Sequence, residues 1–322
     1  MGRKVIQIAD STQLISLPRQ WTKKYNVKKG DELEVVEKDN MLEVWTKRED
    51  LLQEITLDVT DLDRTSIFIV LRAAYRRGYD VIKVNFKNKT AVHYRTGEKV
   101  LVATLLHEEL RRWVGMQIIE QKENYFVYKS ISKPSFEELE SMLRRTFLLL
   151  MDACDEFVKA CENDNKVLLE TMDQKFFNIL IFIAYCERLL NRIGYPEKYK
   201  NILLYAILMN LNKIGDVLRY AAREVLTMKK VHPKTSGILR EIFGTVRVYY
   251  DLFYKFDYHK STTIYKVRDA LIKDIAQVKK TISPEELMLV VYCRSVLEIL
   301  VHNIEATITY SLQEQEKKEI AK

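Results

Sequence analysis

The first 29 residues of the chain carry a concentration of basic side chains. Seven of these residues are basic and one, Asp10, is acidic, so the segment has a net charge of +6. The basic residues are Arg3, Lys4, Arg19, Lys23, Lys24, Lys28 and Lys29. Lysines are point charges suited to phosphate, whereas bidentate reading of bases favours arginine. The segment therefore predicts a surface for a polyanion, or else an ordinary solvated basic face.

The sequence offers no combination of residues typical of catalysis. It contains no glycine-rich phosphate loop, no GxSxG motif and no cysteine–histidine pair in a supporting context. The four cysteines lack CxxC spacing and the five histidines are scattered, so no zinc pattern is present. We therefore predict that the protein is not an enzyme and that its thiols are reduced and buried.

The composition is typical of a helix-rich protein with several domains. A length of 322 residues allows two or three domains, and 47% apolar residues are enough for proper cores. The chain has only 9 glycines and 5 prolines, which favours long helices over loop-rich β folds. We identify no apolar run of about 20 residues and no signal-peptide pattern. We expect a cytoplasmic protein without membrane insertion.

The first two zones of the chain contain short strands. Residues 1–50 read as strands around one short helix over 18–27, opened by Pro18, and end in a hairpin that turns at Asp39 and Asn40. Residues 51–131 alternate strands with helices over 63–78 and 97–113. This alternation indicates a small α/β domain.

Residues 132–322 show only helical patterns. We predict six helices, over 135–162, 164–194, 197–227, 234–256, 261–281 and 283–318. Such lengths with short joints are typical of antiparallel bundles. Residues 211–224 and 297–310 share a pattern at an offset of 86, which predicts two three-helix units in tandem.

The N-terminal zone is too small to be stable by itself. A strand–helix–hairpin of under 50 residues buries too little surface, and its strands present open edges. A second copy, with the hairpins interleaved into one small barrel, would remedy both problems. We therefore predict a homodimer that pairs through residues 1–50 and brings its two basic helices to one side.

The N-terminal zone resembles the AbrB/SpoVT-type swapped-hairpin DNA-binding domain. The pieces "STQLISLPRQW" and "VKKGDELEV" carry most of this resemblance. Leu14 stands where many members of that family carry an arginine. The resemblance implies that basic residues around the first strands and the helix hold double-stranded DNA, mainly by its phosphates. The matching positions are Arg3, Lys4, Arg19, Lys23 and Lys24.

The helical zone resembles PhoU domains over roughly residues 135–320. The segment "LNKIGDVLRYAAREV" carries the resemblance, and "AAYRRGYDVIKVNF" and "RRWVGMQIIEQ" match an archaeal group of phosphate-uptake regulators. The fold implied is multidomain, with an N-terminal swapped-hairpin β-barrel, a small α/β middle domain and an all-α PhoU-like domain of two three-helix bundles. The corresponding ranges are 1–50, 51–131 and 132–322.

The resemblance to PhoU domains also implies a transition metal, iron or zinc. PhoU domains commonly bind such ions through acidic pairs four residues apart, because residues at that spacing share a helix face. The alternatives are a solvated face or contacts with a partner protein. The positions that match, with the pattern only partly kept, are Asp173, Asn212, Asp216, Glu298 and His302.

These features together predict a DNA-binding transcriptional regulator of phosphate uptake. The helical zone would sense phosphate status directly or through phosphate transporter or sensor components. One alternative is a signalling adaptor that contacts such components without binding DNA, in which the N-terminal barrel serves only dimerisation. Another is a non-specific DNA-compacting factor whose helical bundle is structural.

Overall fold

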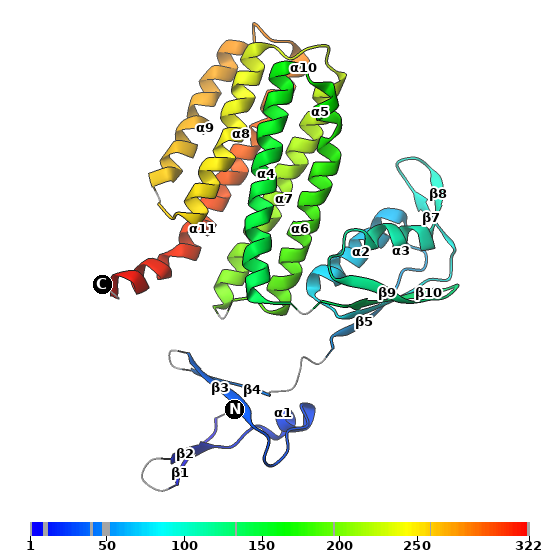
Figure 1. Cartoon of the computed structure of the whole chain (residues 1–322), viewed down its shortest axis with the longest axis vertical. Coiled ribbons are helices and arrows are strands. Elements are labelled where there is room, and N and C mark those ends of the chain that lie inside the picture. The colour runs from blue at the N-terminus through cyan, green and yellow to red at the C-terminus, as the bar shows by residue number, and fades with distance from the viewer. Residues whose placement is uncertain are drawn as a thin grey trace. The chain divides into compact units, whose positions relative to one another are not determined.

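The chain divides into two compact units, which we call the N-terminal unit and the main unit. The computed structural model describes residues 2–8, 12–38, 41–46, 52–132, 134–195, 197–257 and 259–320. The N-terminal unit spans Met1–Leu52 and the main unit Gln53–Lys322. Figure 1 shows the strands of the first unit and the long helices of the second. The predicted boundary at 131 lies inside the main unit, so separate domains there stay a prediction.

The N-terminal unit consists of two antiparallel strand pairs and one short helix. Strands β1 (Val5–Ile8) and β2 (Thr12–Ile15) pair with each other, and β3 (Leu33–Lys38) pairs with β4 (Met41–Thr46). The second pair confirms the predicted hairpin, whose turn residues Asp39 and Asn40 lie outside the described residues.

Helix α1 (Arg19–Lys24) is shorter than the predicted 18–27. Pro18 is the extended residue before the helix, with a ψ of 124°, and not its first helical residue. The helix ends early because Asn26 adopts a left-handed φ of 49°, a conformation that asparagine tolerates better than most residues.

The main unit begins with an α/β segment. Its sheet has the order β5–β6–β10–β9, in which β5 (Glu54–Asp58) and β6 (Val81–Asn85) are parallel. Helix α2 (Arg64–Arg77) joins these two strands, with Asp63 as its N-cap and Gly78 at its C-cap. The strands β9 (Met116–Gln121) and β10 (Tyr125–Ser130) complete the sheet antiparallel.

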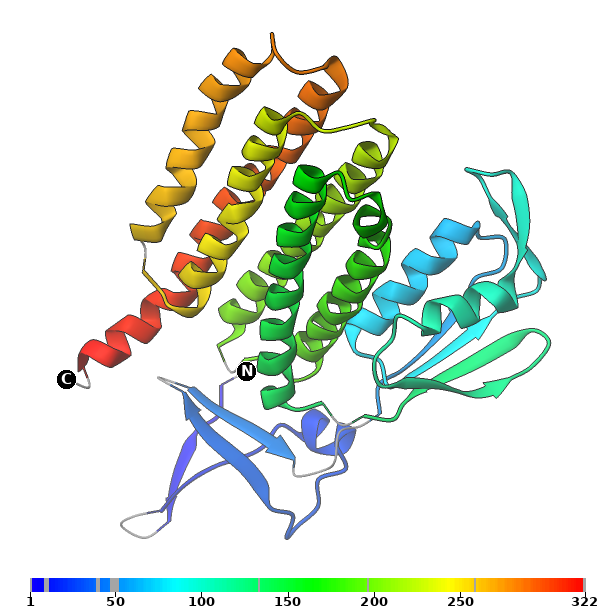
Figure 2. The ribbon, with the colours of Figure 1, turned by 45° about the horizontal axis from the view of Figure 1, so that its top comes forward.

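The predicted helix over 97–113 is wrong at its beginning. Residues Glu98–Leu101 form a strand, β8, which pairs antiparallel with β7 (Thr90–His93). Gly97, with a left-handed φ of 73°, closes the turn by donating its backbone N–H to the carbonyl oxygen of His93 at 2.8 Å. Helix α3 therefore spans only Val102–Leu110. It packs against α2, and Figure 2 shows both helices beside the sheet.

The remaining secondary-structure elements of the main unit, among the described residues, are helices. Each of the six predicted helices is present, but Thr171 divides the second and Arg294 divides the sixth. Ser135 and Ser283 cap two of the helices by accepting backbone N–H groups, as polar N-caps do. The helices are α4 (Phe136–Asn163), α5 (Lys166–Glu170), α6 (Met172–Arg192), α7 (Lys198–Thr227), α8 (Pro233–Tyr254), α9 (His259–Val278), α10 (Pro284–Cys293) and α11 (Ser295–Ile320).

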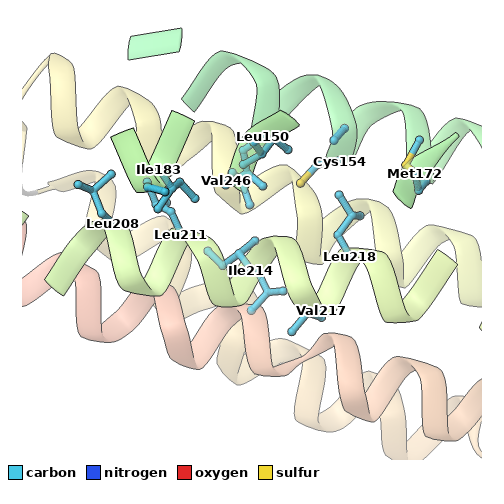
Figure 3. Close-up of a cluster of buried hydrophobic side chains, with 14 of the residues drawn as sticks. Leu150, Cys154, Met172, Ile183, Leu208, Leu211, Ile214, Val217, Leu218 and Val246 are labelled. Carbon is cyan, nitrogen blue, oxygen red and sulfur yellow. The ribbon is translucent and has the colours of Figure 1, made fainter. Parts of the chain in front are cut away.

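The long helices form two sets of three that share one core. Helices α4, α6 and α7 pack against one another, as do α8, α9 and α11, and contacts between α4 and α8 and between α7 and α11 join the sets. Apolar residues recur every three or four positions of α7 from Leu204 to Val225, and this face is buried. Figure 3 shows Leu211 and Ile214 of α7 near Leu150 of α4, Ile183 of α6 and Val246 of α8.

One described segment, Pro284–Leu312, is long and apolar enough to cross a membrane by length and composition. Its residues Val290, Leu297, Leu300 and Ile304 are at most 1% exposed within the bundle. A core helix of a soluble protein passes the same test, so the segment is weak evidence for a membrane span. The expected lack of membrane insertion stays a prediction.

Candidate functional site

The strand register of the N-terminal unit gathers several of its predicted DNA-binding residues. Val5 lies opposite Ile15 in the β1–β2 pair. Arg3 and Lys4, which precede Val5, therefore lie at the end of the pair from which the chain continues through Pro18 into α1. Arg19 is the first residue of that helix. The two basic segments consequently share one end of the strand pair.

The basic residues of α1 are positioned at its C-terminal end. Lys23 and Lys24 occupy the last turn, where cations are favoured by the helix dipole. The Lys24 ammonium lies 5.3 Å from the centre of the Tyr25 ring. All five predicted contact residues, Arg3, Lys4, Arg19, Lys23 and Lys24, are exposed. The geometry leaves them accessible to a polyanion, and their role in DNA binding stays a prediction.

The turn that follows α1 has a defined geometry. The backbone N–H of Lys28 donates to Oδ2 of Asp31 at 2.8 Å, and the N–H of Asp31 donates to the carbonyl oxygen of Lys28 at 3.2 Å. Gly30 adopts a φ of 91°, which favours glycine. This turn directs the chain from the basic helix into β3.

None of the N-terminal side chains whose exposure the structure describes is buried. Its strands carry large apolar side chains that are between 45% and 65% exposed. These residues are Val5, Ile6, Ile8, Leu14, Ile15, Val35 and Leu42. Such exposure of apolar strand surface marks an interaction face. The unit lacks an interior of its own within the described residues.

The predicted metal ligands of α6 and α7 are paired with arginines. Asp173 accepts from Nη2 of Arg223 at 2.7 Å, and Asp216 accepts from Nη2 of Arg219 at 3.0 Å. A guanidinium beside each carboxylate opposes a metal cation there by charge repulsion. Asn212 contributes only an amide, and it lies one turn before Asp216 on the same helix.

The other predicted ligands, Glu298 and His302, are exposed on α11. Within the described part of the chain, no three histidine, cysteine or acidic side chains gather in a way that could hold a metal ion. The predicted donor set therefore does not fit a metal ion in this arrangement. The resemblance to PhoU domains predicts a metal here, and the arginine contacts of Asp173 and Asp216 argue against it.

Sequence reasoning missed a basic cleft in the main unit. It lies where α2 approaches α6 and α7, and its walls carry Arg72, Arg76, Arg77, Arg112 and Arg219. Asn212 and Asp216 also line this cleft. The only signal in the sequence is the arginine pairs at 76–77 and 111–112, because the arginines come from three separate segments.

Comparison with protein families identifies the N-terminal unit. Residues 6–48 match the model of the MazE antitoxin family, described as antidote-toxin recognition MazE, bacterial antitoxin. The unit is therefore a domain of the MazE/AbrB type, which confirms that part of the predicted architecture.

Comparisons of the chain with whole proteins do not identify the main unit. No curated protein matches the chain significantly. Among solved structures, the phosphate transport system regulatory protein PhoU from Streptococcus pneumoniae is similar, with a TM-score of 0.42 and 16% sequence identity. The match covers 54% of this chain and 94% of that chain. A likeness of this size carries no argument about function.

Proposed function

We propose that the protein is a cytoplasmic, homodimeric DNA-binding regulator of phosphate uptake. The observation that carries the proposal is the exposed group of basic residues around β1, β2 and α1, in a domain of the MazE/AbrB type. Five exposed cations within 22 residues give a protomer several possible phosphate contacts, which dominate affinity for duplex DNA.

The homodimer is supported by the exposure of the N-terminal side chains that the structure describes, none of which is buried. Apolar side chains on β1, β2, β3 and β4 remain exposed in one chain. Interleaving with a second copy would bury them and satisfy the open strand edges. The same pairing would double the number of cations that face one duplex.

The phosphate part of the proposal rests on the sequence likeness of residues 135–320 to PhoU domains. In this proposal the helices of the main unit respond to phosphate status, directly or through transporter or sensor components. The response would alter how the paired N-terminal units hold DNA by shifting a conformational equilibrium.

A signalling adaptor that does not bind DNA is the second candidate. The exposed apolar side chains on the strands of the N-terminal unit favour this candidate, because pairing of two chains would account for them without any contact with DNA. In that case the basic residues would be idle, and the contacts that matter would be those of the helical bundle with other proteins.

Fluorescence anisotropy with labelled duplexes across a salt series tests the proposal. We expect the wild-type chain to bind its own promoter region or that of a phosphate transporter more tightly than a scrambled duplex. Replacing Lys23 and Lys24 by alanine should weaken binding and reduce the salt slope by about 1 for each lysine removed from the interface. The control replaces Lys229 and Lys230, two adjacent exposed lysines of the main unit, by alanine.

The same titration separates the alternatives. No binding to any duplex at moderate salt would contradict the regulator and support the adaptor. Equal affinity for all duplexes would support a DNA-compacting factor. Equal weakening by the two double-alanine variants would place the interaction outside α1 and overturn the assignment of Lys23 and Lys24.

A further inference from the structure

The basic cleft of the main unit has the size of a small-molecule site. Its volume is about 610 Å³, within the range of roughly 300–1,000 Å³ typical of ligand pockets. Helix α2 contacts α6 directly, and Figure 1 shows the two helices beside each other. The cleft is therefore formed by segments that are packed together, with α7 completing the wall.

Positive charge dominates the walls of this cleft. Three arginines, Arg72, Arg76 and Arg77, come from α2, while Arg112 follows α3 and Arg219 comes from α7. Asp216 is the one acidic residue among the lining residues. A neighbouring hollow of about 490 Å³ shares Arg112 and adds Arg64 and Arg111, with Glu108 as its acid. An anion entering the cleft would therefore meet a strongly positive surface.

Two buried acidic side chains outside the cleft contact two of its arginines. Glu109 is 1% exposed and accepts two hydrogen bonds from Arg72, at 2.9 and 3.0 Å. Glu187 is fully buried, and its Oε2 lies 2.8 Å from Nε of Arg76. Neither carboxylate lines the cleft itself. Arg72 is thus held in place before any ligand arrives, which reduces the entropy cost of binding.

Several polar groups at the cleft have unused hydrogen-bonding capacity. Nε of Arg219 and Oδ1 of Asn212 are buried and have no hydrogen-bond partner among the described residues. Arg77 is exposed and forms no ion pair with any described residue. Burial lowers the pKa of Arg112, and the nearby Arg72 and Arg219 lower it further. These cations repel one another, so a bound anion would relieve the repulsion.

The cleft also has an apolar wall. Ile69, Leu180 and Tyr205 line it, together with Phe176, which is only 5% exposed. The guanidinium carbon of Arg219 lies 4.7 Å from the centre of the Phe176 ring. Inorganic phosphate would leave this wall unused, whereas a ligand with a flat aromatic body could pack against it.

We propose that this cleft binds a nucleoside phosphate. The guanidinium groups of α2 and Arg219 hold the phosphates, a role for which arginine is suited by its bidentate geometry. The base packs against the accessible part of the apolar wall, formed by Ile69, Leu180 and Tyr205. This binding is independent of the proposed contact with DNA, which belongs to the N-terminal unit.

Isothermal titration calorimetry with the full chain tests this proposal, using ATP, AMP, adenosine and inorganic phosphate as probes. We expect ATP and AMP to bind, and both adenosine and inorganic phosphate to bind at least tenfold more weakly. Arg77→Ala should weaken ATP binding at least about tenfold, since a charged hydrogen bond is lost. Arg145→Ala removes an exposed arginine of α4 that lines neither hollow, and should leave binding unchanged.

A second variant, checked by circular dichroism, distinguishes a loss of binding from a folding defect. Arg219→Ala should also weaken ATP binding at least about tenfold, while circular dichroism reports that the helices are retained. Lack of binding by both ATP and AMP at about 1 mM, a concentration that detects even weak ligands, would overturn the proposal. Equal binding by Arg77→Ala and Arg145→Ala would also overturn it. Inorganic phosphate that binds as tightly as ATP would overturn the assignment of a nucleoside.

Discussion

Arg192 on α6 and Asp80 before β6 form a buried ion pair, with Nη2 lying 3.1 Å from Oδ2 and both side chains less than a tenth exposed. Asp80 also accepts the backbone N–H of Gln53 at 2.8 Å. Two neighbours of Arg192 extend this seam: Arg188 and Asn191 donate to the carbonyl oxygens of Tyr75 and Arg76 at the end of α2. The α/β segment is therefore fixed to the bundle by polar contacts from one end of α6.

Breaking this pair should destabilise the main unit. Arg192→Met leaves the Asp80 carboxylate buried without its partner, which typically costs about 3–5 kcal/mol. Urea unfolding followed by circular dichroism measures the loss. The double variant Arg192→Met with Asp80→Asn should recover part of it, since no charge is left buried. A loss below about 1 kcal/mol would contradict a role for the pair in holding the seam.

Glu187 should make stability depend on pH in an unusual direction. Burial raises its pKa to about 7, while Arg76 opposes this rise. The folded chain thus holds this proton more tightly than the unfolded chain, whose glutamate titrates near 4.5. The contribution of Glu187 to stability is fully present below pH 4.5 and is lost as the pH rises through 7, by about 3 kcal/mol.

The variant Glu187→Gln isolates this effect from other titrating groups. Its side chain stays neutral at every pH, so the stability of the wild type relative to the variant should fall between pH 4.5 and 8. Urea midpoints at several pH values measure this difference. If the stability of the wild type relative to the variant stays constant or grows with pH, Glu187 is ionised throughout and held by Arg76.

Gly215 on α7 allows the close approach of α6. A Cβ atom at this position would lie 2.4 Å from Cε2 of the Phe176 ring. Gly215→Ala should therefore displace Phe176, a residue of the basic cleft, and cost about 1–3 kcal/mol by overpacking. Thermal unfolding measures the loss of stability, and titration with ATP measures the effect of the displaced ring on binding in the cleft.

A second glycine provides the matched control for this substitution. Gly244 lies in α8, and a Cβ there would meet nothing within 4 Å. Gly244→Ala should stabilise the chain by about 0.5–1 kcal/mol, because alanine favours the helix. Destabilisation of similar size in both variants would mean that the cost at Gly215 does not arise from Phe176.

Pairing of the N-terminal unit predicts a concentration-dependent dimer. Val35 on β3 is 56% exposed in the single chain, and an aspartate there would place a charge on the face that we expect to be buried. Val35→Asp should therefore give a monomer in sedimentation experiments. Val167→Asp alters an equally apolar residue of α5 that is 73% exposed, and should remain dimeric. A monomeric wild-type chain would end the swapped-barrel proposal.

Elemental analysis of protein purified without chelator tests the metal prediction. The arginine partners of Asp173 and Asp216 lead us to expect well below one iron or zinc ion per chain. Stoichiometric metal that disappears in Asp216→Ala would contradict this expectation. It would show that a metal ion displaces Arg219 from the Asp216 carboxylate.

The sequence was most informative where helical periodicity was long. The predicted helices over 197–227 and 283–318 agree with α7 and with the beginning of α10, because apolar residues recur along α7 from Leu204 to Val225 and Ser283 caps α10. The breaks at Thr171 and Arg294 were missed because apolar residues continue the period across both positions. The strand β8 was missed because Val100 and Leu101 extend the apolar pattern of α3.

The sites were less predictable than the fold. The basic residues of the N-terminal unit are close in the sequence, so their charge was visible directly. The basic cleft depends on α2 meeting α6 and α7, which brings Arg76 and Arg219 together from positions 143 residues apart in the chain. The partners of Asp173 and Asp216 were equally hidden, because Arg223 reaches Asp173 from another helix.

The exposure of the described N-terminal side chains, none of which is buried, has a consequence for dosage if the unit pairs as proposed. A segment that gains its interior only from a second polypeptide has a folding equilibrium coupled to protein abundance. In the proposed homodimer, few assembled barrels would exist when the chain is scarce, and their number would rise with the square of the monomer level. Promoter occupancy would then switch on above a threshold of synthesis, without any signal reaching the helices.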